Sequence, residues 1–326
     1  MILGSRNRSI LLGTALCALA GCGGGDAADA PASGAEGEEA AWVPPRDTDV
    51  LVAELTQAAD GSWSIGAPVN VTQRPDYDNQ PAFTPDGQGL LYTVNDPQSG
   101  QADIWRYDLG AETVTRVTAT APESEYSAAY TLDETAVTVI RVEADSTQRL
   151  WAIGVNDTGE SPVFEDVAPV GYYAQTDATT YYMFVLGSPP TLVRNRTDVD
   201  DPTVLAENIG RSIHRIPGTS DVSFVQRHDD GSSSIMRILG GDASGTPAEI
   251  TPAIADGDFH AWTPDGQVLM ADGARIHAFD PDGAATWVEV ADFSDLSISI
   301  SRLAVSMDGS QIAIVAEPAM DLLPGD

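Results

Sequence analysis

One short turn recurs along this chain and constrains its fold more than any other feature. Thr84-Pro85-Asp86-Gly87 interrupts a run of alternating apolar residues, and Thr263-Pro264-Asp265-Gly266 does the same near the other end. Pro presets φ early in a tight turn and Gly takes the left-handed conformation, so each copy predicts a β-hairpin. Weaker copies complete a series of turn aspartates, 43 to 47 residues apart: Asp86, Asp133, Asp177, Asp221, Asp265 and Asp308.

Each turn introduces a unit of about forty residues that contains further predicted strands. The strand after each turn is rich in β-branched and aromatic residues, which suits a strand covered on both faces; these strands are 90–94, 136–140, 181–185, 222–226, 268–272 and 311–315. Third strands are predicted at 103–108, 149–154, 191–196, 234–239 and 275–280. Fourth strands are predicted at 113–118, 162–167, 202–208, 247–252 and 287–292. Four strands per unit are typical of a β-propeller blade.

The segments left over at the two ends complement each other. Residues 48–72 contain what look like third and fourth strands, at 49–54 and 67–72, whereas residues 299–318 contain a first and a second strand. Together they would form a closing blade that removes two exposed sheet edges. The sequence therefore predicts one all-β, six-bladed propeller of four-stranded antiparallel blades over 48–318, followed by a tail at 319–326, rather than the two domains that the length alone would allow.

The unit at 79–109, with PAFTPDGQGLLYT and ADIWRYDL, resembles the repeats of TolB-type propellers. Those propellers are related to WD-repeat propellers and to the propellers of prolyl oligopeptidase-like enzymes. The motif is a folding signature and does not specify a ligand. TolB itself has an additional N-terminal α/β domain, which residues 1–47 do not resemble, so its role in the Tol–Pal system is not carried over. The Gly-x-Ser-x-Gly motif of a serine hydrolase is absent from the sequence.

The N-terminal segment has the pattern of an export signal. Arg6 and Arg8 precede an apolar run at 10–20, which is too short to be a permanent membrane span. Leu19-Ala20-Gly21-Cys22 resembles a bacterial lipobox, and this resemblance implies a signal peptide at 1–21 and attachment of acyl chains, palmitate among them, at Cys22. The only other cysteine, Cys17, lies within the signal, so no disulfide is expected in the mature protein.

The residues after Cys22 predict how the protein is attached. Residues 22–47 are rich in Gly, Ala, Glu and Pro, which is typical of a flexible tether. Inner-membrane retention signals have Asp directly after the lipidated Cys, whereas this chain has Gly23. We therefore expect a cell-envelope protein on the outer membrane, facing the periplasm. The net charge is −33, from 49 acidic residues and 16 basic residues, all of them Arg. Such a charge disfavours nucleic acid and anionic lipid surfaces, so contact with the membrane is expected through the lipid anchor alone.

Aligning the repeats places several polar residues on the strand that should line the central channel. These channel candidates are Gln80, Tyr126, Tyr172, Arg211, His214, His260 and Arg302. Two Arg, a His and a Gln in one funnel are suited to bind a carboxylate, a sugar acid or the end of a peptide. The alternative is that the two Arg balance neighbouring carboxylates of an acidic protein. We expect His277 to pack in or between blades, His228 to be solvated in a turn, and Trp63 either to contact a partner or to pack across its loop.

Two functional hypotheses follow. The first is a non-catalytic, monomeric binding or scaffold module that receives a protein or peptide partner of the envelope and has no cofactor. The second is a carbohydrate-active or metal-dependent enzyme, because Gln80, His214 and His260 resemble the His and Gln residues that hold a divalent cation in propeller polysaccharide lyases. Acidic clusters also offer oxygen ligands for Ca²⁺, although Asp often caps β-turns instead; these are Asp198, Asp200, Asp201, Asp280 and Asp282.

Overall fold

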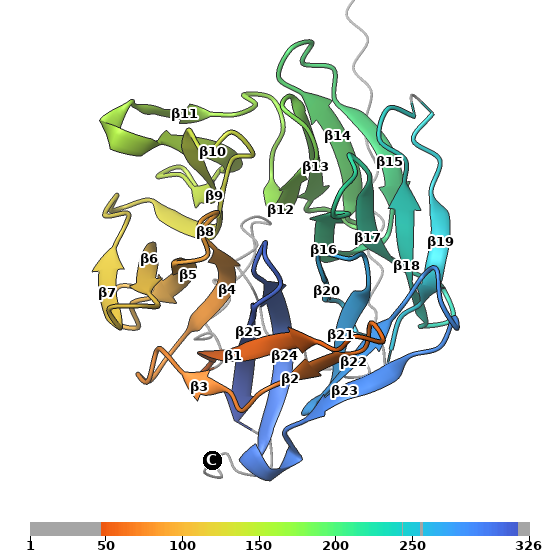
Figure 1. Ribbon diagram of the computed structural model, residues 1–326. Coiled ribbons are helices and arrows are strands. Elements are labelled where there is room, and N and C mark those ends of the chain that lie inside the picture. The colour runs from red at the N-terminus through yellow and green to blue at the C-terminus, as the bar shows by residue number, and fades with distance from the viewer. Residues whose placement is uncertain (1–46, 243, 255–256, 319–326) are drawn as a thin grey trace, which may run out of the picture.

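In the computed structural model, the described residues are 47–242, 244–254 and 257–318, and they form six antiparallel sheets arranged in a ring (Figure 1). We number the sheets as blades 1 to 6. Blade 1 contains β4 (Asp78–Phe83), β5 (Gly89–Asn95), β6 (Ala102–Asp108) and β7 (Thr113–Arg116). Blade 2 contains β8 (Ser124–Tyr130), β9 (Ala136–Val142), β10 (Gln148–Gly154) and β11 (Glu160–Pro162). Blade 3 contains β12 (Val170–Gln175), β13 (Thr180–Val185), β14 (Thr191–Arg196) and β15 (Thr203–Glu207).

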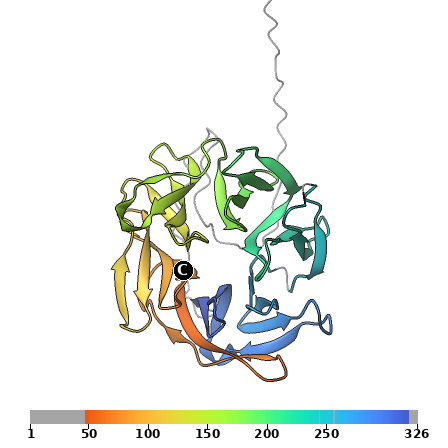
Figure 2. The ribbon, with the colours of Figure 1, turned by 45° about the horizontal axis from the view of Figure 1, so that its top comes forward.

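Blade 4 contains β16 (Ile209–Arg215), β17 (Val222–Arg227), β18 (Ser233–Ile238) and β19 (Ala248–Pro252). Blade 5 contains β20 (His260–Trp262), β21 (Val268–Asp272), β22 (Arg275–Phe279) and β23 (Val288–Asp292). The first strand of each blade lies nearest the centre of the ring (Figure 2). Short 3₁₀ turns occur at η1 (Val155–Asp157) and η2 (Ser294–Leu296). The predicted six-bladed propeller is confirmed.

Blade 6 is built from both ends of the described chain, as the leftover segments predicted. β24 (Ile298–Val305) and β25 (Gln311–Pro318) are its first two strands, and β1 (Asp49–Gln57) is the third. β1 lies beside β25, with Leu51 opposite Ile314 (Figure 1). Two short strands, β2 (Trp63–Ile65) and β3 (Val69–Asn70), both pair with β1 on its other side. β2 was not predicted, because Trp63 was placed in a loop.

The core lies between the blades. Tyr182 and Phe184 of β13 are buried against Ile209 and Phe224 of blade 4 in one apolar cluster. The second strands are therefore covered on both faces, which explains why they are almost continuously apolar.

The hairpin turns use their Asp side chains for local hydrogen bonds. Thr131 Oγ1 lies 2.7 Å from Asp133 Oδ1, and Ser306 Oγ lies 2.7 Å from Asp308 Oδ1. The prediction for blade 4 was wrong. Its turn is closed by the amide of Thr219, which donates to the Ile216 carbonyl, and Asp221 follows the turn and accepts a hydrogen bond from Gly240 N. Part of the regular Asp spacing was therefore coincidental.

The fourth strand of blade 2 also differs from its prediction. Residues 162–167 were expected to form it, but β11 ends at Pro162. Phe164 and Val167 are buried in an apolar cluster with residues of blades 2 and 3. Their apolar pattern reflects this packing between blades, so it was mistaken for the pattern of a strand.

Candidate functional site

β-bulges determine which side chains face the channel. In the described chain, five of the six inner strands change register against their neighbour at the level of the channel candidates; these shifts lie at 79–82, 126–129, 170–172, 209–213 and 300–302. A bulge bends its strand and redirects a side chain. Gln80 and Ser127 adopt φ values of 57° and 53°, which are uncommon for residues other than glycine. The backbone of the inner strands is therefore irregular at the channel candidates.

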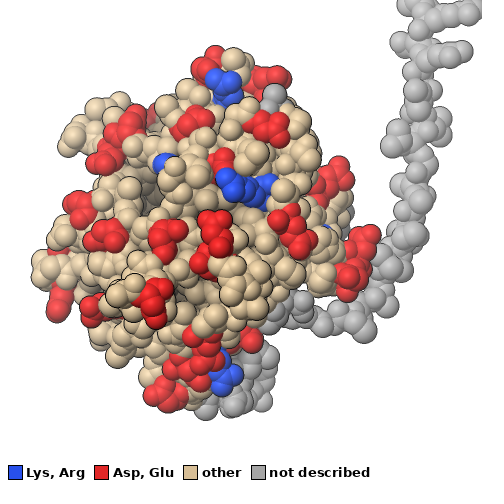
Figure 3. All heavy atoms as spheres, turned by 45° about the vertical axis from the view of Figure 1, so that its right-hand side comes forward, with Lys and Arg blue, Asp and Glu red and all other residues tan. Residues whose placement is uncertain are grey.

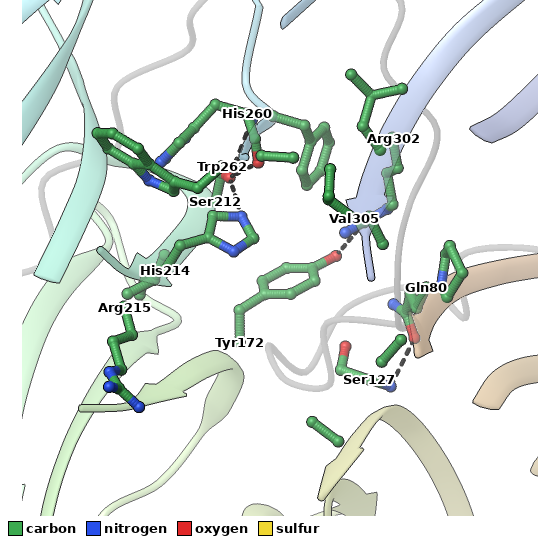
Figure 4. Close-up of a pocket in the computed structure, with 18 of the residues that line it drawn as sticks. Gln80, Ser127, Tyr172, Ser212, His214, Arg215, His260, Trp262, Arg302 and Val305 are labelled. Carbon is green, nitrogen blue, oxygen red and sulfur yellow. Dashed lines mark hydrogen bonds between the residues drawn. The ribbon is translucent and has the colours of Figure 1, made fainter. Parts of the chain in front are cut away.

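All six blades contribute to one cavity of about 390 Å³ at the centre of the ring (Figure 4). Six of the channel candidates line it: Gln80, Tyr172, Arg211, His214, His260 and Arg302. Tyr126 lines a second cavity of about 230 Å³, which shares three of its lining residues with the first: Gln80, Tyr172 and Arg211. The structure therefore brings the seven predicted residues together around two adjoining cavities.

Arg302 is held in the larger cavity by two aromatic rings. Its guanidinium carbon lies 3.9 Å from the centre of the Phe259 ring and 5.0 Å from the centre of the Tyr172 ring. Its Nη2 also donates to Tyr172 Oη at 2.8 Å (Figure 4). Cation–π contacts of this kind fix the orientation of the planar cation.

Gln80 is held by hydrogen bonds from blades 1 and 2. Its Oε1 accepts hydrogen bonds from Thr93 Oγ1 at 2.9 Å and from Ser127 N at 2.8 Å. Both lone-pair positions of this oxygen are thereby used, and the orientation of the amide is determined.

A pair of histidines lines another side of the larger cavity. The His214 and His260 rings are 4.8 Å apart in an edge-to-face arrangement. His214 Nε2 lies 2.9 Å from Ser212 Oγ, which also accepts a hydrogen bond from His260 N at 3.1 Å. His260 Nε2 lies 2.8 Å from Ser223 Oγ, which accepts from Trp262 Nε1 at 2.8 Å. These bonds join blades 4 and 5.

Burial keeps these imidazoles neutral. Burial lowers the pKa of His214 to about 4; a hydrogen bond to the His260 backbone opposes the shift, and the positive charge of Arg302 adds to it. Burial, together with His214, also holds the pKa of His260 well below its ordinary value. Sequence reasoning missed Ser223. A Ser in the middle of an otherwise apolar buried strand was the available signal, because such a hydroxyl needs a partner.

The sign of charge in the channel differs from that of the exterior. Arg211, Arg215 and Arg302 line the larger cavity, and none of the described residues that line either cavity is Asp or Glu. The outer face in Figure 3 shows many acidic side chains and few Arg. Arg227, in the smaller cavity, pairs with Asp258. The described lining of the larger cavity is therefore positively charged, in an acidic protein.

A divalent cation does not fit the described residues. No three His, Cys, Asp or Glu side chains converge anywhere in the described ranges. The oxygen of Gln80 already accepts two hydrogen bonds, and the Nε2 atoms of His214 and His260 each face a serine hydroxyl. In the acidic clusters, Asp280 Oδ1 accepts a hydrogen bond from Asp282 N, and Asp198 forms an ion pair with Arg196. These side chains therefore make contacts with residues of their own turns.

The remaining singled-out residues have structural positions. His228 is exposed with Nε2 2.9 Å from Ser234 Oγ, and His277 is half-buried in β22. Trp63 is buried in β2 and donates from Nε1 to Asp265 Oδ1 at 3.2 Å, so it packs across the junction of blades 5 and 6. Cys22, the signal, most of the tether and the tail at 319–326 lie outside the described residues. Within the described ranges, no helix has the length and apolarity needed to cross a bilayer.

Comparison with known proteins identifies the architecture. No protein-family model matches the sequence, and no curated protein sequence matches it significantly. A putative TolB from Agrobacterium tumefaciens superposes with a TM-score of 0.62 at 14% identity, over 83% of this chain and 98% of that one. TolB from Acinetobacter baumannii gives 0.54 at 14% identity, over 85% of this chain and 66% of that one, so this chain spans about two thirds of its length.

A gluconolactonase from Xanthomonas campestris gives a TM-score of 0.57 at 12% identity, over 85% of this chain and 99% of that one. These similarities define the class of protein as a six-bladed β-propeller. Its structural neighbours include TolB-type proteins. At such low identities the similarity describes the fold, and function must be argued from the site.

Proposed function

We propose that this protein is a non-catalytic binding or scaffold module of the bacterial cell envelope, and that its channel receives a protein or peptide partner. The observation that carries this proposal is the larger cavity, to which all six blades contribute and whose polar groups hold one another in fixed positions. A rigid ring that presents loops and a shaped opening is suited to recognition without chemical turnover.

The hydrogen bonds of the histidine pair argue against a nucleophile and base. Ser223 is fully buried, and its hydroxyl already accepts from Trp262 Nε1. In the Ser-His-acid arrangement a carboxylate orients the second ring nitrogen of the histidine. Here, His260 Nδ1 has no hydrogen-bond partner among the described residues. The channel histidines therefore fit a structural role better than a catalytic one.

Crosslinking in intact cells tests the proposal. Met307, 74% exposed at the mouth of the cavity, is replaced by a photoreactive amino acid, and Val114, 46% exposed on β7, is replaced in a control. We expect a discrete protein or peptide adduct from position 307 and none from position 114. Equal adducts from both positions, or none from position 307, would contradict the proposal. Turnover of a uronic acid polysaccharide that is lost on combined Arg211→Ala, His260→Ala and Arg302→Ala substitution would support the enzyme hypothesis instead.

The proposed location rests on the lipobox-like Leu19-Ala20-Gly21-Cys22. Acylation of Cys22 would hold the ring at the periplasmic face of the outer membrane, because several acyl chains give stable attachment. Cells labelled with a palmitate analogue should yield labelled wild-type protein in the outer-membrane fraction. The Cys22→Ala variant should be unlabelled and lost from that fraction, and an unlabelled wild-type protein would contradict the anchor.

A further inference from the structure

The charge in the larger cavity is opposite to that of the chain as a whole. The chain has a net charge of −33, yet three of its 16 Arg line this cavity, and no Asp or Glu does so among the described lining residues. Exterior charges are screened by salt over about 8 Å at physiological ionic strength, whereas charges inside a partly enclosed cavity are screened much less. The charged side chains among the described lining residues are therefore all Arg.

Arg302 has the orientation that recognition of an anion requires. Phe259 and Tyr172 contact its guanidinium, and the hydrogen bond to Tyr172 Oη fixes its rotation. An arriving carboxylate would not have to order a mobile side chain, which lowers the entropic cost of binding. A guanidinium is also the group whose planar N–H donors match a carboxylate best.

Two buried polar atoms on different sides of the cavity have no hydrogen-bond partner among the described residues. They are Ser127 Oγ, on the side of Gln80, and His260 Nδ1, on the side of Ser212 (Figure 4). His260 itself is only 1% exposed. Each is an unsatisfied buried polar atom of a cavity-lining residue, a feature that is uncommon in folded proteins.

Apolar residues surround these polar groups. Phe83, Ile213, Leu303 and Val305 line the cavity, and Met307 lies exposed at its mouth. The lining thus presents both Arg and apolar side chains to a ligand. A ligand that fits carries an anionic group and an apolar part.

We infer that the larger cavity binds a ligand through a carboxylate, held by Arg302 and Arg211, with the apolar part of the ligand against the apolar side chains of the lining. This inference rests on the proposed function, since it names the ligand chemistry of the same site. The free C-terminal carboxylate of a peptide and the carboxylate of a uronic acid share this chemistry. The apolar part of the lining favours the peptide terminus over the hydroxyl-rich sugar.

The test compares ligands that differ only in this group. The purified full-length protein is immobilised and exposed to random-sequence hexapeptides with free C-termini, to the same mixture with amidated C-termini, and to oligogalacturonate. We expect the free-acid peptides to be retained at least about ten-fold better than the amides, because only the free acid forms charge-assisted hydrogen bonds with the Arg side chains. This comparison uses wild-type protein alone, so it does not depend on any variant folding.

Variants then assign the binding to the cavity. Arg302→Gln should abolish the preference for the free acid, whereas Arg275→Gln, on the exposed end of β22, should leave it unchanged. Equal retention of acids and amides, or no retention of peptides and oligogalacturonate alike, would overturn the inference while leaving the crosslinking result intact. Retention of oligogalacturonate without peptides would support the carboxylate and contradict the peptide partner.

Discussion

Two neutral imidazoles pack edge to face on one side of the channel, where protonation of either would place a charge among buried groups. The pKa of His214 is about 4, against an ordinary value of 6.5, because the folded protein disfavours the charged ring. As pH falls below 6.5, the unfolded chain therefore binds a proton at His214 that the folded chain does not bind. The stabilising contribution is complete above about pH 6.5 and is lost progressively toward pH 4.

This linkage predicts a steeper loss of stability in acid for the wild type than for His214→Asn. The difference of about 2.5 pKa units corresponds to about 3 kcal/mol between pH 6.5 and 4. Urea unfolding measured at several pH values between 7.5 and 4.5 gives the free energy of unfolding for both proteins. Exposed His228 provides the control, since His228→Asn should keep the wild-type pH profile. Parallel profiles for the wild type and His214→Asn would show that His214 is not buried in the neutral form.

At the scale of a strand, closure of the ring depends on β25. Ile314 is fully buried and lies opposite Leu51 on β1 and Leu303 on β24. Replacing Ile314 by Ala removes apolar contacts in the closing blade, and such substitutions cost about 2–5 kcal/mol. Chemical denaturation should show this loss, whereas Val69→Ala on β3, where the side chain is 62% exposed, should change stability little. A similar small effect at both positions would mean that the two ends of the chain do not share a packed blade.

The elements that the sequence predicted are those that local chemistry encodes. A Thr-Pro-Asp-Gly turn specifies its hairpin within a few residues, and repetition then extends the prediction to blades and to the closing pair. The bonds of the channel are different, because Ser212 contacts His260 across 48 positions and Ser223 contacts Trp262 across 39. Bulges also decide which residues of an inner strand face the cavity, and no feature of the sequence marked them. The repeat register could place the candidates on the right strand but could not show their partners.

For the whole molecule, the exterior and the larger cavity differ in the sign of their charged side chains. Acidic residues outnumber Arg by 49 to 16 and are scattered over the face shown in Figure 3, while the described lining of the larger cavity contains Arg. Repulsion among like charges keeps a protein soluble but destabilises its compact state. The cationic cavity is in turn the part of this molecule where an anion can approach without meeting a described carboxylate in the lining.

Salt should therefore stabilise this protein. Raising NaCl from 0.01 M to 0.15 M shortens the screening length from about 30 Å to about 8 Å, which weakens repulsion among the exterior carboxylates. The same salt weakens the surface ion pairs, but each of these contributes only about 0–1 kcal/mol, so the relief of repulsion should prevail and Tm should rise. Calorimetry measures Tm, with sucrose at equal osmolality as a control for excluded-solute effects. An unchanged or lower Tm in salt would show that the net charge of −33 is already balanced within the folded chain.

Calcium should have no effect of its own beyond screening. CaCl₂ at equal ionic strength should therefore give about the same Tm as NaCl. A clearly larger rise in Tm would instead indicate specific cation binding to the acidic turns, because a bound cation stabilises the folded state by mass action.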